Sequence, residues 1–227
     1  MIGDAWLRVH EDVCTELAAA EPAIDPSTLR RAVTATIDGF PAHYGDDWTL
    51  GRLSGAAIAH HIWVGALDVA GYRDAGLLDT VLQLEQRAAA RQFTAFDDVA
   101  GLRDATTAAG IPVALVTNGA SDSQRGKLAA AGITSWFAGL AISGELGVAK
   151  PNPAVFAPAL AAVDASAGDR GVWHVGDNLA ADVAGANAAG ITSVWLNRAG
   201  AARGVDDAVP ALEVTGLTAL LPHLSPT

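Results

Sequence analysis

The stretch that decides the fold is Trp173-His-Val-Gly-Asp-Asn-Leu-Ala-Ala-Asp182. An apolar run leads into Gly176, and two carboxylates follow at Asp177 and Asp182, five positions apart. Ligands of parallel sheets bind beyond the carboxyl ends of the strands, so this order predicts a strand that ends at a site. Mg²⁺ prefers hard oxygen ligands and commonly takes one or two protein carboxylates together with phosphate and water. The stretch therefore predicts a magnesium site at a strand end.

The composition narrows the class of protein and of partner. The chain has 227 residues, of which 51% are hydrophobic, and no apolar run approaches the roughly 20 residues of a membrane span. A single cysteine, Cys14, cannot form an internal disulfide, which is typical of a reducing cytoplasm. With 14 basic and 25 acidic residues the net charge is −11, which argues against nucleic acid or an anionic membrane as partner. We therefore expect a cytoplasmic protein. The negative net charge does not exclude a phosphorylated small molecule as partner, because a local Lys and Mg²⁺ can make a single pocket positive.

The periodicity of the sequence changes near residue 93. Before it, apolar residues recur at helical spacing, and after it short β-rich runs alternate with helices. The expected helices before the change are 6–20, one that begins at Asp25-Pro26-Ser27 and ends at Gly39-Phe40-Pro41, 53–69 and 74–91. The expected strands after it are 111–116, 137–142, 171–175 and 191–196. Alternating strands and helices imply a parallel sheet with right-handed crossovers, so we predict a helical domain at 1–93 and an α/β domain at 94–227.

Three groups of polar residues follow the predicted strands in order. Thr117-Asn118-Gly119 offers a hydroxyl and backbone N–H groups at the start of a helix, which is typical of an anion cradle. Lys150 precedes a proline and can neutralise phosphoryl charge as a point cation. The acids at Asp177 and Asp182 come third. Taken singly, Thr-Asn-Gly is more often just a turn, a lysine before proline is usually on the surface, and paired acids are usually solvated. Together and in this order the three groups favour a phosphate and metal site.

With these residues the chain resembles the haloacid dehalogenase-like superfamily, in its phosphatase branch with a helical cap. Thr117 looks like the second motif of that family, Lys150 like the third, and Asp177 with Asp182 like the fourth. The resemblance implies a Rossmann-like parallel-sheet core and an N-terminal all-helical cap. It also implies an Mg²⁺-dependent hydrolase of phosphoric monoesters that works through an aspartyl-phosphate. The acidic pair favours a phosphatase over a dehalogenase, because dehalogenation needs no metal.

The resemblance also implies roles for single residues. Thr117 would bind phosphate together with Asn118 and Gly119, and Lys150 would neutralise its charge. Asp177 would ligate the metal, and Asp182 would ligate it directly or through water. Asn178 would contact these ligands without binding the metal itself. In this architecture the cap faces the active site and selects the substrate. Two residues of the predicted cap are candidates to hold a second anionic group of the substrate, although each is more often a plain surface residue: Arg52 and His60.

The first motif of the family, an apolar strand that ends in Asp-x-Asp, has no counterpart in this sequence. Its first Asp would be the nucleophile. By the resemblance this strand is the central one, between the strands at 111–116 and 171–175. Without this strand, the two strands that would flank it each have an inner edge with no hydrogen-bonding partner. Each buried unpaired backbone group costs about 1–3 kcal/mol.

Three explanations of this gap stay open. The strand is encoded ahead of residue 1, or the two flanking strands pair directly, or another chain donates a strand. For the chain as it stands we expect very low phosphatase turnover, because the covalent agent is absent. The alternative function is a non-catalytic relative that binds a phosphorylated ligand or a partner protein.

Overall fold

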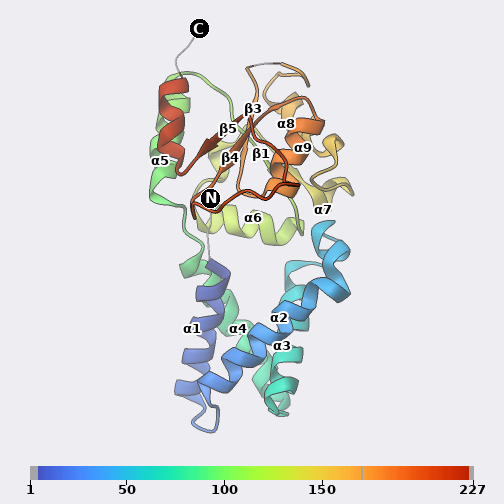
Figure 1. The fold of residues 1–227 in the computed structure, drawn as a ribbon. Coiled ribbons are helices and arrows are strands. Elements are labelled where there is room, and N and C mark those ends of the chain that lie inside the picture. Colours follow the sequence, from blue (N-terminus) through green and yellow to red (C-terminus); the bar gives the residue numbers. More distant parts are fainter. Residues whose placement is uncertain (1–4, 170, 225–227) are drawn as a thin grey trace. The chain divides into compact units, whose positions relative to one another are not determined.

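The structure, a computed structural model, describes residues 5–169 and 171–224. The chain divides into two compact units, one made of Met1–Ala95 with Gly119–Thr134 and the other of Phe96–Asn118 with Ser135–Thr227. The first is helical and the second combines helices with parallel strands, which confirms the α/β class with a helical N-terminal part (Figure 1). The predicted domain boundary at 93/94 stays a prediction.

Helices make up the first unit. They are α1 (Ala5–Ala20), α2 (Pro26–Thr49), α3 (Gly55–Ala70), α4 (Ala75–Gln92) and, from the second segment of the unit, α6 (Ser121–Ala130). Local sequence explains where three of them begin, because side-chain oxygens accept hydrogen bonds from the free N–H groups of the first turn. Asp25 caps α2 through the backbone N–H groups of Ser27 and Thr28, Ser54 caps α3, and Asp74 caps α4.

The helix α2 is longer than the sequence indicates. We expected it to end at Gly39-Phe40-Pro41, but it continues to Thr49. A proline inside a helix removes one hydrogen bond and crowds the preceding turn. Packing outweighs that cost here, since the ring of Phe40 is buried and lies 4.8 Å from the ring of Tyr44 and 5.9 Å from that of Trp48 between ring centroids.

The core of the helical unit follows the predicted apolar faces. Val9, Val13 and Leu17 of α1 are fully buried and pack in one cluster with Trp63 of α3 and Val81 of α4. Full burial of side chains of this size stabilises a fold by about 1.5–3 kcal/mol each. The cluster therefore packs α1, α3 and α4 against one another, and the hydrogen bond from the indole N–H of Trp63 in α3 to Glu85 in α4 adds a polar contact.

The second unit contains short parallel strands with helices beside them. Its α-helices are α5 (Asp97–Ala108), α7 (Ser143–Leu146), α8 (Ala157–Ala162) and α9 (Ala184–Ala188). The 3-10 and π-helical segments are η1 (Thr134–Trp136), which begins at the last residue of the first unit, η2 (Pro153–Phe156), η3 (Leu179–Val183) and η4 (Leu217–His223). Its strands are β1 (Ala114–Thr117), β2 (Gly139–Ile142), β3 (Trp173–Gly176), β4 (Thr192–Leu196) and β5 (Leu212–Val214). Figure 1 shows α5 on one side of the strands and α8 and α9 on the other. The expected alternation of strand and helix is therefore confirmed.

The strands form two separate parallel sheets rather than one. The first sheet pairs β1 with β2, with Ala114 opposite Gly139, and the second has the order β3-β4-β5, with Trp173 opposite Thr192. Among the described residues β1 and β3 do not pair, so the flanking strands have not closed the gap expected between them. One apolar cluster contains Val116 of β1 and Ala141 of β2, and Val172, which precedes β3, packs against it. The described strands of the unit thus form two parallel sheets that share this cluster.

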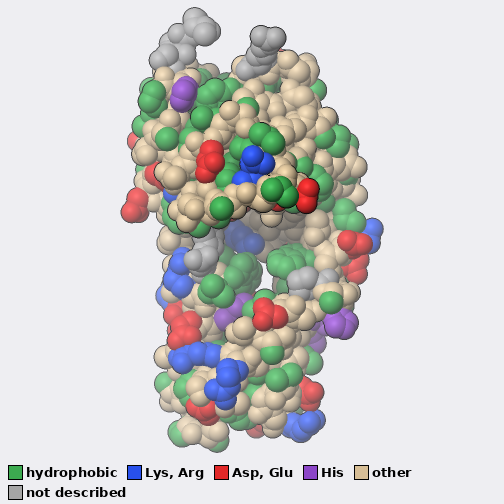
Figure 2. All heavy atoms as spheres, viewed as in Figure 1, with side chains coloured by type: hydrophobic (Ala, Val, Ile, Leu, Met, Phe, Trp, Pro, Cys, Tyr) green, Lys and Arg blue, Asp and Glu red, His purple; other side chains and the backbone are tan. Residues whose placement is uncertain are grey.

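Charged side chains of both signs lie on the surface (Figure 2). On the face shown in Figure 2, acidic and basic side chains are interspersed. Within the described ranges, none of the helices has the length and apolar character needed to cross a bilayer.

Candidate active site

Lys150 is held in place by the side chain of Asn118. The backbone N–H of Lys150 donates to Oδ1 of Asn118 at 2.9 Å, and Nδ2 of Asn118 donates to the carbonyl of Lys150 at 3.0 Å. Asn118 directly follows β1, so this double hydrogen bond fixes the lysine against the carboxyl end of that strand. The sequence pointed to Asn118 as a phosphate ligand, whereas its amide here orients Lys150.

The ammonium of Lys150 links β1 to the η3 turn. It donates to the carbonyl of Val116 in β1 at 3.0 Å and to Oδ1 of Asp182 at 2.6 Å. Only 11% of the lysine side chain and 7% of the aspartate side chain are exposed. The cation is therefore largely shielded from solvent.

Asp182 carries three hydrogen bonds on its two oxygens. Nε2 of His174, a residue of β3, lies 3.1 Å from Oδ1, which also receives the lysine, and the backbone N–H of Asn178 donates to Oδ2 at 3.0 Å. Burial alone raises the pKa of Asp182, but the hydrogen bond from His174 and the charge of Lys150 together hold that pKa well below its usual value. The carboxylate is thus kept ionised as the partner of a cation.

Gly176 is the residue that allows Asp182 to approach the strand. A Cβ at this position would lie 2.2 Å from Cγ of Asp182, closer than side-chain atoms come in proteins. The turn that carries Asp182, η3, is a short π-helical segment, a form that often occurs at functional sites. Gly176 and this turn together bring Asp182 onto the end of β3.

The other predicted residues have different surroundings. The side chain of Asp177 is exposed, and its carbonyl accepts a hydrogen bond from the indole N–H of Trp195 at 3.0 Å. Oδ1 of Asn178 accepts from the N–H of Ala181 and so caps η3. Thr117 ends β1 and is half-buried. The structure therefore brings Thr117, Lys150 and Asp182 to the strand ends and leaves the Asp177 carboxylate facing solvent.

Gly119 and the two cap candidates belong to the other compact unit. Gly119 has a φ of +124° and no room for a Cβ, which would lie 2.8 Å from Nε2 of Gln124. Arg52 pairs with Asp47 at 3.1 Å on an exposed surface. His60 is exposed, with its ring 6.1 Å from that of His61. None of these contacts is with a residue of the Lys150 site.

The residues of the site do not by themselves fit a bound Mg²⁺. Both oxygens of Asp182 already serve Lys150, His174 and a backbone N–H. Across the described part of the chain, no three His, Cys, Asp or Glu side chains are grouped as metal ligands would be. Asp177 offers one exposed carboxylate, which is fewer ligands than an all-protein site needs.

His174 is the site residue that sequence reasoning missed. A histidine within the apolar run before Gly176 has its side chain on one face of β3, two positions from the strand end. Its position three residues before Asp177, in the strand that leads to the predicted metal ligands, was the available signal. A polar residue in an otherwise apolar strand indicates a buried partner, and the partner here is Asp182.

Fold and site together define an α/β protein of Rossmann-like type, with a helical N-terminal part and a buried lysine–aspartate pair at the strand ends. The model of the haloacid dehalogenase-like hydrolase family matches residues 11–190, and the chain belongs to this family.

Relatives of known activity share part of the sequence. A phosphoserine phosphatase of Thermus thermophilus is 44% identical over 89 residues, which are 39% of this chain and 35% of that enzyme. The pyrimidine 5′-nucleotidase YjjG of Escherichia coli is 41% identical over 86 residues, 37% of each chain. The matches thus span little more than a third of these relatives.

The similarity of fold extends further than the similarity of sequence. A 2-haloacid dehalogenase structure from Pseudomonas syringae has a TM-score of 0.66 and 23% identity, and the match covers 98% of this chain and 91% of that one. This likeness shows that nearly the whole chain has the fold of that structure.

Proposed function

We propose that this protein has the binding site of a phosphatase that acts on a small phosphorylated metabolite. The observation that carries the proposal is the ammonium of Lys150, fixed by Asn118 and presented at the ends of β1 and β3. A phosphate monoester is the anion expected beside such a cation, with the Thr117 hydroxyl at the same strand end. The relatives that match the sequence best among those described above are a phosphatase and a nucleotidase, which supports the same substrate class.

We propose that the attacking carboxylate comes from outside these 227 residues, on an extended strand between β1 and β3. The gap between the two sheets is where such a strand would pair, because parallel strands add to open edges through main-chain hydrogen bonds. Its terminal Asp would approach Lys150, which now has Asp182 as its partner. The strand has two possible sources, an additional segment of the same polypeptide or a second chain.

The added strand would also complete the ligands for Mg²⁺. An added carboxylate at the end of that strand, together with the exposed Asp177, would give Mg²⁺ the oxygen ligands that the described residues lack. The metal would supply positive charge to the phosphoryl group there. We therefore propose that Mg²⁺ dependence appears only when the strand is present.

The test is complementation of the chain with a strand. The 227-residue protein would be assayed with Mg²⁺ and p-nitrophenyl phosphate, first alone, then with a peptide of an apolar strand ending in Asp-x-Asp, then with this segment fused ahead of residue 1. We expect turnover close to the buffer rate alone and a large increase with the added strand. The matched control has Asn in place of the first Asp, which keeps the strand and removes the nucleophile.

Two outcomes would overturn parts of this proposal. Turnover at rates normal for an enzyme by the 227-residue protein alone would show that no added nucleophile is needed. No turnover with any strand, together with no binding of inorganic phosphate in calorimetry, would remove the phosphatase assignment.

The second candidate function is binding without catalysis. The observation that favours it is that the charge of Lys150 is already balanced by Asp182 inside the site, so the network is stable without a substrate. Such a protein would bind inorganic phosphate or an extended segment of a partner and release no product. Binding of the Asn-containing control peptide, with no turnover even with the Asp-containing peptide, would support this function over the first.

A further inference from the structure

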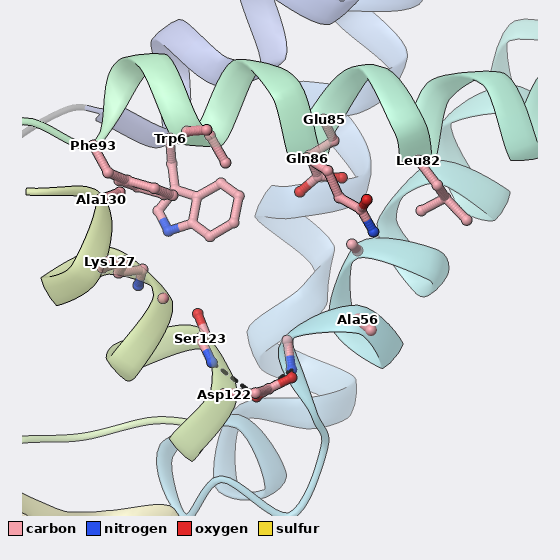
Figure 3. A pocket seen from close by; sticks show the side chains of 15 residues that line it. Trp6, Ala56, Leu82, Glu85, Gln86, Phe93, Asp122, Ser123, Lys127 and Ala130 are labelled. Carbon is pink, nitrogen blue, oxygen red and sulfur yellow. Dashed lines mark hydrogen bonds between the residues drawn. The ribbon is translucent and has the colours of Figure 1, made fainter.

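The helical unit contains a cavity that the proposed hydrolase site does not use. Its volume is about 420 Å³, within the roughly 300–1,000 Å³ of small-molecule pockets. All of its lining residues belong to the unit made of Met1–Ala95 and Gly119–Thr134, and they come from α1, α3, α4, α6 and the residues flanking them. Figure 3 shows the indole of Trp6 between α4 and α6, and the amide of Gln86 on the side of α4 that faces α3.

The walls of this cavity are mainly apolar. Alanine side chains of α3, α4 and α6 line it together with Leu82 and the rings of Trp6 and Phe93. The two rings meet edge to face, with centroids 5.0 Å apart. Small side chains on the helices leave the space, and the aromatic rings give it a flat wall that suits a planar apolar body.

The polar group that distinguishes the cavity is the ammonium of Lys127. It lies 5.3 Å from the ring centroid of Trp6 and 5.8 Å from that of Phe93. Among the described residues it has no carboxylate within salt-bridge distance, and burial lowers its pKa to about 8. At neutral pH the cavity therefore contains a mostly protonated, partly desolvated cation that lies beside two aromatic rings.

The two acids of the lining do not neutralise this cation. The carboxylate of Asp122 accepts hydrogen bonds from the backbone N–H groups of Gly55 at 2.9 Å and of Ser123 at 2.8 Å, as the dashed lines in Figure 3 show. Glu85 is buried and accepts the indole N–H of Trp63. Burial raises the pKa of Glu85 to about 7, against the smaller opposing effect of that hydrogen bond, so much of it is uncharged near neutral pH.

We propose that this cavity binds a small organic monoanion with a flat apolar body, its anionic group paired with the ammonium of Lys127. The body lies along the alanines and Leu82, and the anionic group supplies the counter-charge that the protein does not. The site stands apart from the hydrolase proposal, because it uses none of the residues around Lys150.

The test is calorimetric titration of the full chain at neutral pH with phenylpropionate, its neutral amide phenylpropionamide, and phenylpropylamine. We expect phenylpropionate to bind and the other two to bind at least about tenfold more weakly, because only the carboxylate can pair with Lys127. The variant Lys127→Met keeps the apolar stem and should weaken phenylpropionate by about tenfold or more while leaving the amide unchanged. Arg125→Met is the matched control, since Arg125 belongs to the same helix but does not line the cavity.

A second variant separates loss of the site from loss of the fold. Ala89→Leu fills part of the cavity and should weaken all aromatic probes alike, and circular dichroism with a thermal melt would show that each variant remains folded. No heat with phenylpropionate at millimolar concentration, equal affinity for the acid and the amide, or equal effects of Lys127→Met and Arg125→Met would each overturn the proposal.

Discussion

Nζ of Lys150 lies 2.6 Å from Oδ1 of Asp182, and both side chains are almost entirely buried. A buried ion pair of this kind does not by itself show that the pair stabilises the fold. Removal of one partner is nevertheless strongly destabilising, because it leaves the other charge buried without a counter-charge. The pair therefore makes the site sensitive to substitution even without a substrate. That sensitivity can be measured directly, independently of any catalytic assay.

The first prediction concerns Asp182→Asn. The change removes the counter-charge of Lys150 and one partner of His174, so the free energy of unfolding should fall by roughly 3 kcal/mol in urea denaturation. Asp177→Asn is the matched control, because that carboxylate is exposed and its loss should change stability by less than about 0.5 kcal/mol. Equal effects of the two substitutions would show that the buried Lys150–Asp182 pair contributes no more to the free energy of unfolding than an exposed carboxylate does.

The second prediction concerns Gly176→Ala. The added methyl group would lie 2.4 Å from Cβ and 2.2 Å from Cγ of Asp182, so the Asp182 side chain must shift from the position in which it pairs with Lys150. We expect destabilisation of about 1–3 kcal/mol, the usual range for overpacking, and weaker binding of inorganic phosphate or of a complementing strand. Gly126→Ala in α6 is a suitable control, since a Cβ there meets nothing within 4 Å. A fully stable Gly176→Ala variant with unchanged phosphate binding would contradict the described approach of Asp182.

The third prediction concerns Glu85 and pH. The pKa of Glu85 rises from 4.5 to about 7 on burial, so between these values the unfolded chain loses a proton that the folded protein keeps. Stability from this group is therefore complete below pH 4.5 and declines as pH rises to about 7. Since one pKa unit corresponds to about 1.4 kcal/mol, the loss is about 3 kcal/mol. Glu85→Gln should be more stable than the parent at pH 8 and similar at pH 4, as measured by thermal melts across that range.

The fourth prediction concerns His10, a buried residue whose two ring nitrogens have no partner among the described residues. Its ring lies between the rings of Trp6 and Trp63, with centroids 5.7 and 5.8 Å away. Burial lowers its pKa from 6.5 to about 4, so below pH 6.5 the unfolded chain takes up a proton that the folded protein does not. This group therefore lowers stability as pH falls from 6.5 to 4, by about 3 kcal/mol at most.

His10→Phe removes both the unpartnered nitrogens and that proton uptake. We expect a gain of about 1–3 kcal/mol at neutral pH and a larger gain near pH 5. His60→Phe, at an exposed position of α3, is the control for adding an aromatic ring. A loss of stability in His10→Phe at both pH values would indicate that its nitrogens have partners in solution.

The sequence predicted the parts of the fold that depend on local signals. Asp25 and Asp74 cap helices at the expected places, and the strand ends that carry Thr117 and Asp177 lie within a few residues of their predicted positions. The course of α2 past Gly39-Phe40-Pro41 could not be read from the sequence, because burial of Phe40 against its aromatic neighbours decides it. Local propensity is a weak guide wherever packing competes with it.

The candidate site was likewise predicted only in part from the sequence. Spacing after strands was enough to select Lys150 and Asp182, which the structure brings together. It was not enough to show that Asn118 orients the lysine backbone or that His174 shares the carboxylate, because both depend on how three separate segments meet. The roles of Thr117 and Asp177 toward phosphate and metal stay predictions.

The interruption between β1 and β3 has a consequence for how the protein behaves at high concentration. Most sheets expose edge ladders only at their outer margins, where proteins protect them with charges, prolines or bulges. Here, among the described strands, β1 pairs only with β2 and β3 pairs only with β4, so each has a further edge to which an extended chain could add. Light scattering that rises steeply with protein concentration, and falls when a strand-forming peptide is added, is the behaviour to look for during purification.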